Sequence, residues 1–301
     1  MRAIVLLLLF LLAGVPVMVA ANDAHGASAY VRQIEAWRAE RIARLTAPGG
    51  WLSLVGLDWL ADGANTIGSA AGNDIVLTKG PSRLGTVTLR SGKAVIDLDP
   101  AAGATIDGKK VTHAELLDDS HDQPTTVAFG TVSFYVIDRN GKFGVRIKDT
   151  EAEGRIHFLG IDAFPIDPAW RIDAQWVPFD PPHTLETPNV LGQVDKFPVP
   201  GKAVFTRNGH TYELLPVVEV PGDTELFVIF ADRTSGKQTY GAARFLYASK
   251  PKDGRIVLDF NKAYNPPCAF TAFATCPLAP PENRLDLAVT AGEMKYRGGA
   301  H

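Results

Sequence analysis

The polar residues best suited to chemistry gather in one stretch of the chain, residues 232–265. Arg244 lies inside an apolar segment, on the same side of a predicted strand as its small and aliphatic neighbours, so its guanidinium is expected to point inward. A buried guanidinium needs a carboxylate partner or an anionic ligand. The candidate carboxylates are Asp232, Asp259 and Glu293.

Directly after Asp259 the chain enters a loop that carries three hydrogen-bonding side chains and is stiffened by two prolines, Pro266 and Pro267. A rigid loop holds polar groups in fixed geometry, which favours a binding site for a small polar or anionic ligand. The predicted ligand-binding residues are Arg244, Asp259, Asn261, Tyr264, Asn265 and Tyr240. The alternative is that the same residues form a structural polar network that locks the C-terminal loop in place.

Two other functions stay open. The chain could be a hydrolase that uses Asp259 or His183 as a general base, although His183 has no partner visible in the sequence. It could also be a structural protein of the cell envelope without a ligand. His157 lies in an apolar segment and is expected to be a core histidine. Phosphate-binding, dinucleotide-binding and zinc-protease motifs are absent from the sequence, so no cofactor is expected.

Cys268 and Cys276 are the two cysteines of the chain, and they lie eight positions apart. In an oxidising compartment such a pair is expected to form a disulfide. Free thiols or a metal-binding pair are the alternatives. A zinc site would need further Cys or His ligands nearby, and the nearest histidine, His301, is distant in sequence, so we predict no metal.

The N-terminus has the pattern of an export signal. Arg2 is followed by an unbroken apolar run and then by Val19-Ala20-Ala21, which suits signal peptidase. We therefore expect residues 1–21 to be a cleaved signal peptide and the protein to be periplasmic or secreted, with no stable membrane insertion after cleavage. An uncleaved signal anchor is the alternative. The net charge of −3, with both signs interspersed, argues against a nucleic-acid partner.

The rest of the chain predicts a mainly β protein. Tyr30, Ile34, Trp37 and Leu45 recur at near-helical spacing within a helix expected over residues 22–50 and capped by Ser28, and this stripe is expected to dock onto a sheet. Short strands separated by turn signals follow, and Asn140-Gly141 and Asn208-Gly209 are typical of hairpin turns. Strands are expected over residues 51–57, 65–69, 74–78, 85–89, 93–98, 104–106, 126–137, 142–148, 155–161, 170–178, 188–195, 202–206, 211–220, 225–231, 239–247 and 255–260.

A polar run at 113–125 is the best domain boundary. We expect a β-sandwich lobe over 51–118, a second antiparallel β-sandwich or barrel lobe with the candidate site over 119–296, and a tail over 297–301. The first lobe resembles a forkhead-associated sandwich through Asn73-Asp74-Ile75, Ser82-Arg83 and Asp107-Gly108. That resemblance implies phosphothreonine binding, but Ser69 stands where the phosphate-binding arginine would follow Gly68, so this lobe is expected to be scaffold.

Nearly the whole mature chain resembles the domain-of-unknown-function 1684 family of bacterial and archaeal proteins. The marks are Thr234-Ser235-Gly236, Thr239-Tyr240-Gly241, Arg244-Phe245-Leu246, Asp259-Phe260-Asn261, Ala263 through Cys268, Thr275-Cys276-Pro277, Asn283-Arg284-Leu285, Ala291-Gly292-Glu293, Gly50 through Leu54 and Arg146 through Asp149. The resemblance implies a shared fold and no particular activity.

Overall fold

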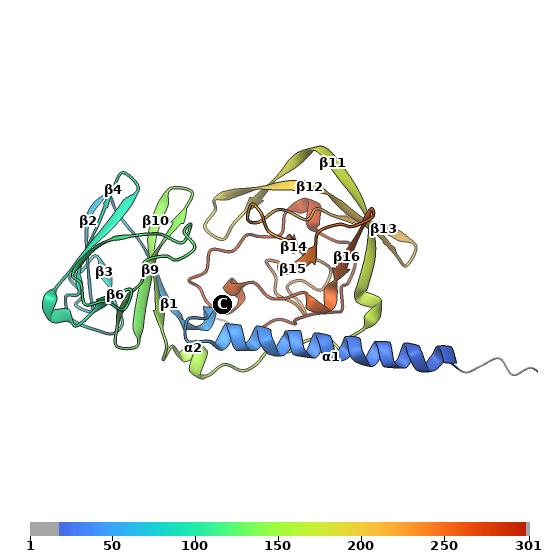
Figure 1. The fold of residues 1–301 in the computed structure, drawn as a ribbon, viewed down its shortest axis with the longest axis horizontal. Helices are drawn as coiled ribbons and strands as arrows, with labels where there is room; N and C mark the ends of the chain where they lie inside the picture. Colours follow the sequence, from blue (N-terminus) through green and yellow to red (C-terminus); the bar gives the residue numbers. More distant parts are fainter. Residues whose placement is uncertain (1–17, 299–301) are drawn as a thin grey trace, which may run out of the picture.

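The computed structural model describes residues 18–298 and shows a mainly β protein of two lobes, with a long helix running along the second lobe (Figure 1). This helix, α1 (Met18–Thr46), starts before the expected bounds of 22–50 and ends before them, and Ser28 lies inside it rather than at its start. Ile34 and Leu45 are buried, so the helical stripe docks onto the rest of the protein as predicted. Among residues 18–298, no helix is long and apolar enough to cross a membrane.

The first lobe is a sandwich of two five-stranded sheets that share one hydrophobic core. One sheet holds β1 (Leu54–Trp59), β10 (Lys142–Asp149), β9 (Val132–Arg139), β8 (Val127–Phe129) and β6 (Thr105–Ile106), in that order. The other holds β3 (Ile75–Val76), β2 (Gly63–Gly68), β4 (Gly85–Arg90), β5 (Lys93–Leu98) and β7 (His113–Leu116).

The sandwich extends to Asp149, beyond the boundary expected at 118, because β8, β9 and β10 supply the second face of its core. The polar run that we expected to divide the lobes is a connection within this sandwich, and part of it is β7. Asn140 and Gly141 have φ values of 56° and 83°, which confirms the β9–β10 hairpin turn. The likeness to forkhead-associated domains stays a prediction.

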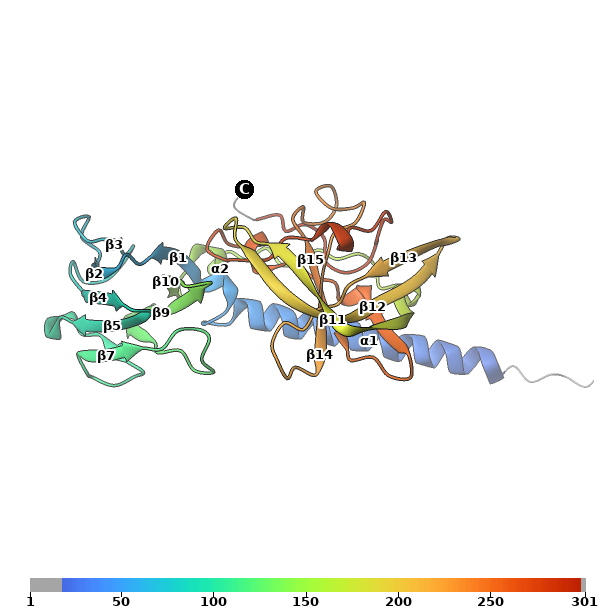
Figure 2. The ribbon, with the colours of Figure 1, turned by 90° about the horizontal axis from the view of Figure 1, so that it is seen from above.

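The second lobe is built on a strongly curved sheet with the strand order β13 (His210–Leu214), β12 (Val194–Arg207), β11 (Arg171–Pro188) and β16 (Arg255–Asp259). A separate pair, β14 (Glu225–Phe230) and β15 (Arg244–Ser249), closes over its concave side. Figures 1 and 2 both show the second lobe beside the sandwich, with α1 running along it. The turn Asn208-Gly209 joins β12 and β13, as predicted.

Two expected strands of this region are wrong. The segment 155–161 contains the end of a short helix, α2 (Glu153–Ile156), and then irregular chain. His157 is accordingly exposed and paired with Glu153, and it is not the core histidine that its apolar neighbours suggested. The strand expected over 170–178 continues to Pro188 as β11, because the proline-rich segment after it resumes the pairing with β12 after an irregularity. The strand expected over 188–195 is mostly the turn that joins β11 to β12.

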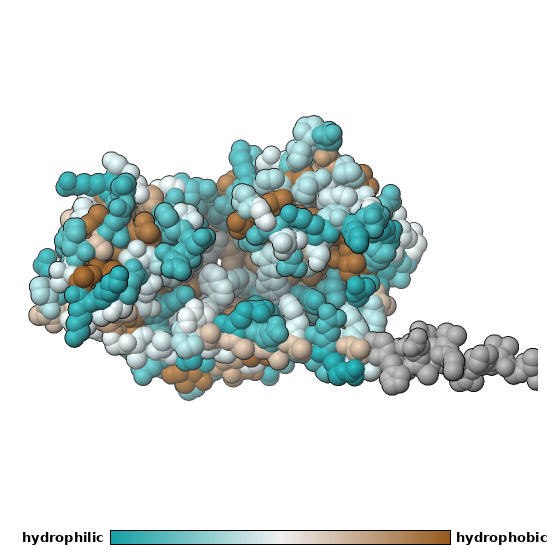
Figure 3. All heavy atoms as spheres, viewed as in Figure 1, coloured by the Kyte–Doolittle hydropathy of each residue, from teal (hydrophilic) through white to brown (hydrophobic). Residues whose placement is uncertain are grey.

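The two lobes touch through polar contacts at the inner end of the sandwich. Arg139 Nε donates to Thr275 Oγ1 at 2.9 Å, and the buried Arg146 reaches the same hydroxyl with Nη2 at 3.3 Å. The surface is hollowed where the lobes meet above α1 (Figure 3). The chain following α1 crosses this junction through a short 3-10 helix, η1 (Trp51–Ser53), whose tryptophan is exposed.

Candidate functional site

Arg244, the predicted centre of the site, is sealed inside the second lobe. Its side chain is 0% exposed, and its Nη2 donates to the equally buried Asp232 Oδ2 at 2.5 Å. Nη1 and Nη2 also donate to the carbonyl oxygens of Ala291 and Val289 at 2.5 and 2.9 Å. Burial lowers the pKa of the guanidinium, and the Asp232 carboxylate opposes that shift. This geometry supports the structural interpretation of Arg244, since none of the cavities described below is lined by it.

Asn265 and Glu293 form a second buried unit, which fastens α1 to the C-terminal loop. Glu293 Oε2 accepts from the backbone N–H of Asn265 at 2.7 Å, and Glu293 Oε1 accepts from Arg41 Nε at 2.6 Å. Arg41 Nη2 donates to the Asn265 carbonyl at 2.8 Å, and Asn265 Nδ2 donates to the Met294 carbonyl at 2.8 Å. These contacts engage the Glu293 carboxylate and the backbone groups and side-chain nitrogen of Asn265, while Asn265 Oδ1 is buried without a hydrogen-bond partner among residues 18–298.

Asp259 and Asn261 form a third unit under the same helix. The Tyr30 hydroxyl donates to Asp259 Oδ1 at 2.7 Å and accepts from Asn261 Nδ2 at 2.9 Å. Asn261 Nδ2 also donates to the Asp167 carbonyl at 2.8 Å. Burial raises the pKa of Tyr30, and the Asp259 carboxylate adds to the shift. This hydroxyl therefore stays a neutral donor that holds the helix in place.

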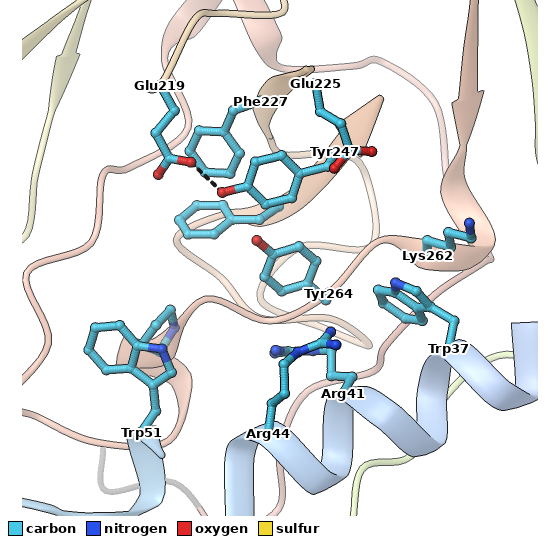
Figure 4. A pocket seen from close by; sticks show the side chains of 12 residues that line it. Trp37, Arg41, Arg44, Trp51, Glu219, Glu225, Phe227, Tyr247, Lys262 and Tyr264 are labelled. Carbon is cyan, nitrogen blue, oxygen red and sulfur yellow. Dashed lines mark hydrogen bonds between the residues drawn. The ribbon is translucent and has the colours of Figure 1, made fainter. Parts of the chain in front are cut away.

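Tyr264 is the predicted residue that lines a cavity of about 530 Å³ between α1 and the β14–β15 pair (Figure 4). The bridge between Phe245 and Tyr264 sets the loop against the edge of β15. The cavity is lined by Trp37, Arg41, Arg44, Trp51, Glu219, Glu225, Phe227, Phe245, Tyr247, Lys262, Tyr264 and Pro267. A volume in the range of 300–1,000 Å³ is typical of small-molecule sites.

Side chains alternate between the two faces of each strand, and this alternation explains why aromatic residues line the cavity. In β15, Leu246 and Ala248 enter the core of the lobe, so Phe245 and Tyr247 point the other way, toward the cavity. In β14, Phe227 lies directly across from Tyr247, with ring centroids 5.0 Å apart. Tyr264 stacks near Tyr247 with centroids 6.3 Å apart. The strands thus present one wall of rings.

Helix α1 supplies the opposite wall. Trp37, Arg41 and Arg44 follow one another at helical spacing and all three reach the cavity (Figure 4). The guanidinium of Arg41 lies 4.3 Å from the centroid of the Tyr264 ring, a cation–π contact. Arg44 is largely exposed and has one distant carboxylate neighbour, Glu40 at 3.8 Å.

Three titratable side chains are coupled along the ring wall. The Tyr247 hydroxyl donates a hydrogen bond to the carboxylate of Glu219 at the mouth (Figure 4). Burial raises the pKa of Tyr247 and of Tyr264 above the usual tyrosine value, and the two hydroxyls influence one another. Burial also raises the pKa of Glu219, while the bond from Tyr247 opposes that shift. At neutral pH both tyrosines are therefore neutral hydrogen-bonding groups.

The predicted disulfide is not formed. Cys268 and Cys276 are both free, and the backbone N–H of Cys268 donates to Cys276 Sγ at 3.2 Å. The Cys276 thiol also interacts with the Cys268 sulfur, which lowers the pKa of Cys268 and raises that of Cys276. The loop between the two cysteines is held by hydrogen bonds at Cys268, so it does not need a disulfide to keep its shape. Tyr240 joins this pair through its hydroxyl, which donates to the Cys268 carbonyl at 3.2 Å.

The two proposed general bases lie in different places. Asp259 pairs with Arg171 at the start of β11, whereas His183 lies twelve residues further along that strand. The His183 ring stacks on Phe179 with centroids 3.9 Å apart. No group of three or more His, Cys, Asp or Glu side chains within residues 18–298 could hold a metal ion.

Several cavity residues were not among the sequence candidates. Trp51 lies in a segment expected to be a strand, but it belongs to η1, is 38% exposed and lines the cavity. Trp37 was predicted only as part of the docking stripe of the helix, and Arg44 was not singled out. Their spacing was a usable signal, since a tryptophan and two arginines at i, i+4 and i+7 share one helix face.

These features define a two-lobed β protein with a helix-walled aromatic cavity. The model of the family described as "Protein of unknown function (DUF1684)" matches residues 156–294, and the chain belongs to this family, as its motifs predicted. The match contains the strand wall of the cavity, while α1 and Trp51 lie outside it.

Solved structures that are similar to part of the chain include one of a haloarchaeal protein. It is the solution NMR structure of an uncharacterized protein of Haloarcula marismortui, with 31% sequence identity and a TM-score of 0.40. The similarity covers 46% of this chain and 78% of that chain. No curated protein matches the chain.

Proposed function

We propose that the protein binds a small polar or anionic ligand in the cavity between α1 and the β14–β15 pair. The observation that carries the proposal is the wall of rings formed by Phe227, Tyr247 and Tyr264, faced by cationic side chains across a space of about 530 Å³. Aromatic faces stack on a planar group, and cations at the rim attract an anionic one.

Two basic residues are free to meet a ligand. Arg41 is occupied by Glu293, but Lys262 forms no ion pair with any residue of the described range 18–298, and Arg44 has only the contact with Glu40. The neutral hydroxyls of Tyr247 and Tyr264 add hydrogen-bonding groups beside the rings. The cavity therefore combines an apolar surface with a few polar groups, which is the usual composition of a ligand site.

The two rival functions have less support. A hydrolase would need a base near the cavity, yet the Asp259 carboxylate is engaged by Tyr30, and the His183 ring lies flat on Phe179. A purely structural protein would account for the sealed Arg244–Asp232 pair, but it would not account for the open aromatic cavity.

The test is a thermal-shift screen of the protein expressed from Asn22, using aromatic carboxylates, phosphate esters, sugars and peptides. A ligand at one hundred times its dissociation constant stabilises the fold by about 2.7 kcal/mol. We expect a hit that also changes the fluorescence of the cavity tryptophans, Trp37 and Trp51. The hit should weaken in Lys262→Met and persist in the control Lys237→Met, which removes an exposed lysine outside this cavity.

A screen without hits would contradict the proposal and favour the structural alternative. So would a hit that binds Lys262→Met, Trp37→Leu and the unmodified protein equally, because such a ligand would sit elsewhere. Both variants replace partly exposed side chains, so neither is expected to unfold the protein.

We also propose that the protein works outside the cytoplasm, because its first 21 residues have the pattern of a cleaved signal. Residues 1–17 lie outside the described part of the chain. The intact mass of protein recovered from the periplasm or the medium should correspond to a chain that starts at Asn22. Protein that keeps Met1 and stays with the membrane would support the uncleaved anchor instead.

A further inference from the structure

A second cavity, of about 440 Å³, adjoins the aromatic one. It lies along β15 and β16, under the outer part of α1. Glu225, Tyr247 and Lys262 line both cavities, so the two spaces share an edge. The remaining residues of the second cavity are Gln33, Arg171, Ala248, Ser249, Lys250, Lys252, Arg255, Ile256, Val257 and Asp259.

The second cavity is strongly basic. Five of its lining residues are Lys or Arg and two are Asp or Glu. Asp259 is engaged by Tyr30 at 2.7 Å, and Arg255 by Asp173 at 3.0 Å. Arg171, Lys250 and Lys252 form no ion pair with the residues described here, 18–298, and the same is true of Lys262 at the shared edge. The cationic side chains that line this cavity thus outnumber its carboxylates.

A tight hairpin positions the lysines. The turn between β15 and β16 places Asp253 and Gly254 at φ values of 51° and 70°, and Lys252 and Arg255 exchange backbone hydrogen bonds of 2.9 Å across it. Lys250 and Lys252 therefore leave the turn beside the end of the ring wall. Neither residue is needed to hold the hairpin through its side chain.

We propose that the two cavities form one bipartite site for a ligand in which a planar ring is joined to a phosphate group. This inference rests on the proposed function. The ring stacks on Tyr247 and Tyr264, and the phosphate is bound among Arg171, Lys250 and Lys252. A phosphate carries close to two negative charges and three acceptor oxygens, so it neutralises a cluster that a single carboxylate would leave positive.

Glu225 marks the junction of the two parts. Its carboxylate is exposed at the edge that both cavities share. There it would accept a hydrogen bond from a hydroxyl of the segment that links the ring to the phosphate. The site therefore favours a linker with hydroxyl groups over a plain hydrocarbon chain.

The test compares matched pairs of compounds by isothermal titration: adenosine with adenosine 5′-monophosphate, uridine with uridine 5′-monophosphate, and phenol with phenyl phosphate. Inorganic phosphate is titrated alone. For at least one pair we expect the phosphate compound to bind about tenfold or more tightly, which corresponds to ~1.4 kcal/mol. The advantage should shrink as salt is raised, because the lysines are exposed.

The double variant Lys250→Ser/Lys252→Ser should bring the phosphate compound to within about twofold of its parent, since the charge-assisted contacts are gone. Binding of the parent compound should not change. The control is Lys109→Ser/Lys110→Ser, which removes the same charge from an exposed turn of the first lobe and should leave both affinities as they were.

Each outcome bears on a different claim. Equal affinity of the paired compounds in the unmodified protein would overturn the phosphate subsite and leave the aromatic cavity as the binding site. Inorganic phosphate that binds as tightly as the ring phosphates would overturn the bipartite site, because the ring would contribute nothing. If none of the phosphate compounds binds, the proposal is rejected, while the wider screen decides the proposed function separately.

Discussion

The buried pair Arg244–Asp232 allows a direct test of whether Arg244 serves the fold or a ligand. Asp232→Asn keeps the acceptor that Oδ1 offers to the backbone N–H of Thr234 at 2.7 Å, but it removes the negative charge opposite the guanidinium. Both side chains of the pair are 0% exposed, so water cannot replace the lost partner without a rearrangement.

Removing one member of a buried ion pair typically costs about 3–5 kcal/mol. We expect Asp232→Asn to lie near the lower end, since Arg244 keeps its bonds to the carbonyls of Ala291 and Val289. Arg244→Met should lie near the upper end, because it leaves the Asp232 carboxylate buried without its counter-charge and removes a donor from two carbonyls. The double variant should cost less than the sum of the two by ~2 kcal/mol or more, since it leaves no unpaired charge.

The assay is urea unfolding of the four proteins, with the free energies of unfolding combined in a double-mutant cycle. Arg233 pairs with Asp286 on the surface next to this site, so Arg233→Met is a matched control and should show no measurable change. Additive effects of Asp232→Asn and Arg244→Met would refute the reasoning. So would a stable Arg244→Met protein that has lost ligand binding, since that result would restore Arg244 as a ligand residue.

Three further predictions concern single sites. Burial raises the folded-state pKa of Glu219, so its stabilising contribution is present below the unfolded pKa of about 4.3 and is lost as the pH rises through the folded pKa. The thermal midpoint of the unmodified protein should therefore fall relative to that of Glu219→Gln as the pH is raised from about 4. Gly292→Ala should destabilise the protein by about 1–3 kcal/mol more than the control Gly222→Ala. Both glycines have positive φ, but a Cβ at position 292 would lie 2.4 Å from the Ala263 carbonyl oxygen. Equal losses in urea unfolding would contradict a role for that contact. Iodoacetamide should modify Cys268 before Cys276, since the pKa of Cys268 is lowered and that of Cys276 raised, and peptide mass spectrometry showing the opposite order would contradict this assignment.

Local signals in the sequence were sufficient for much of the secondary structure. The hairpins at Asn140-Gly141 and Asn208-Gly209 follow from residue type alone, since a two-residue turn of this kind needs positive φ at both positions. The helix stripe identified Ile34 and Leu45 as docking residues because apolar spacing on a helix reports the face that is buried. The family was recognisable because each of its motifs is a short run of neighbouring residues, which can be read without knowing the fold.

Only the tertiary structure decided to which lobe each strand belongs and which polar side chains remain accessible to a ligand. β8, β9 and β10 join the first lobe because they complete its core, a pairing that the turn residues between them do not encode. Tyr30 meets Asp259 across 229 positions, and Arg41 meets Glu293 across 252. These long-range contacts engage the carboxylates of Asp259 and Glu293, which the sequence analysis had considered for the candidate site. The same docking of α1 created a cavity from side chains, such as Trp37 and Arg44, that share no local pattern with the strands they face.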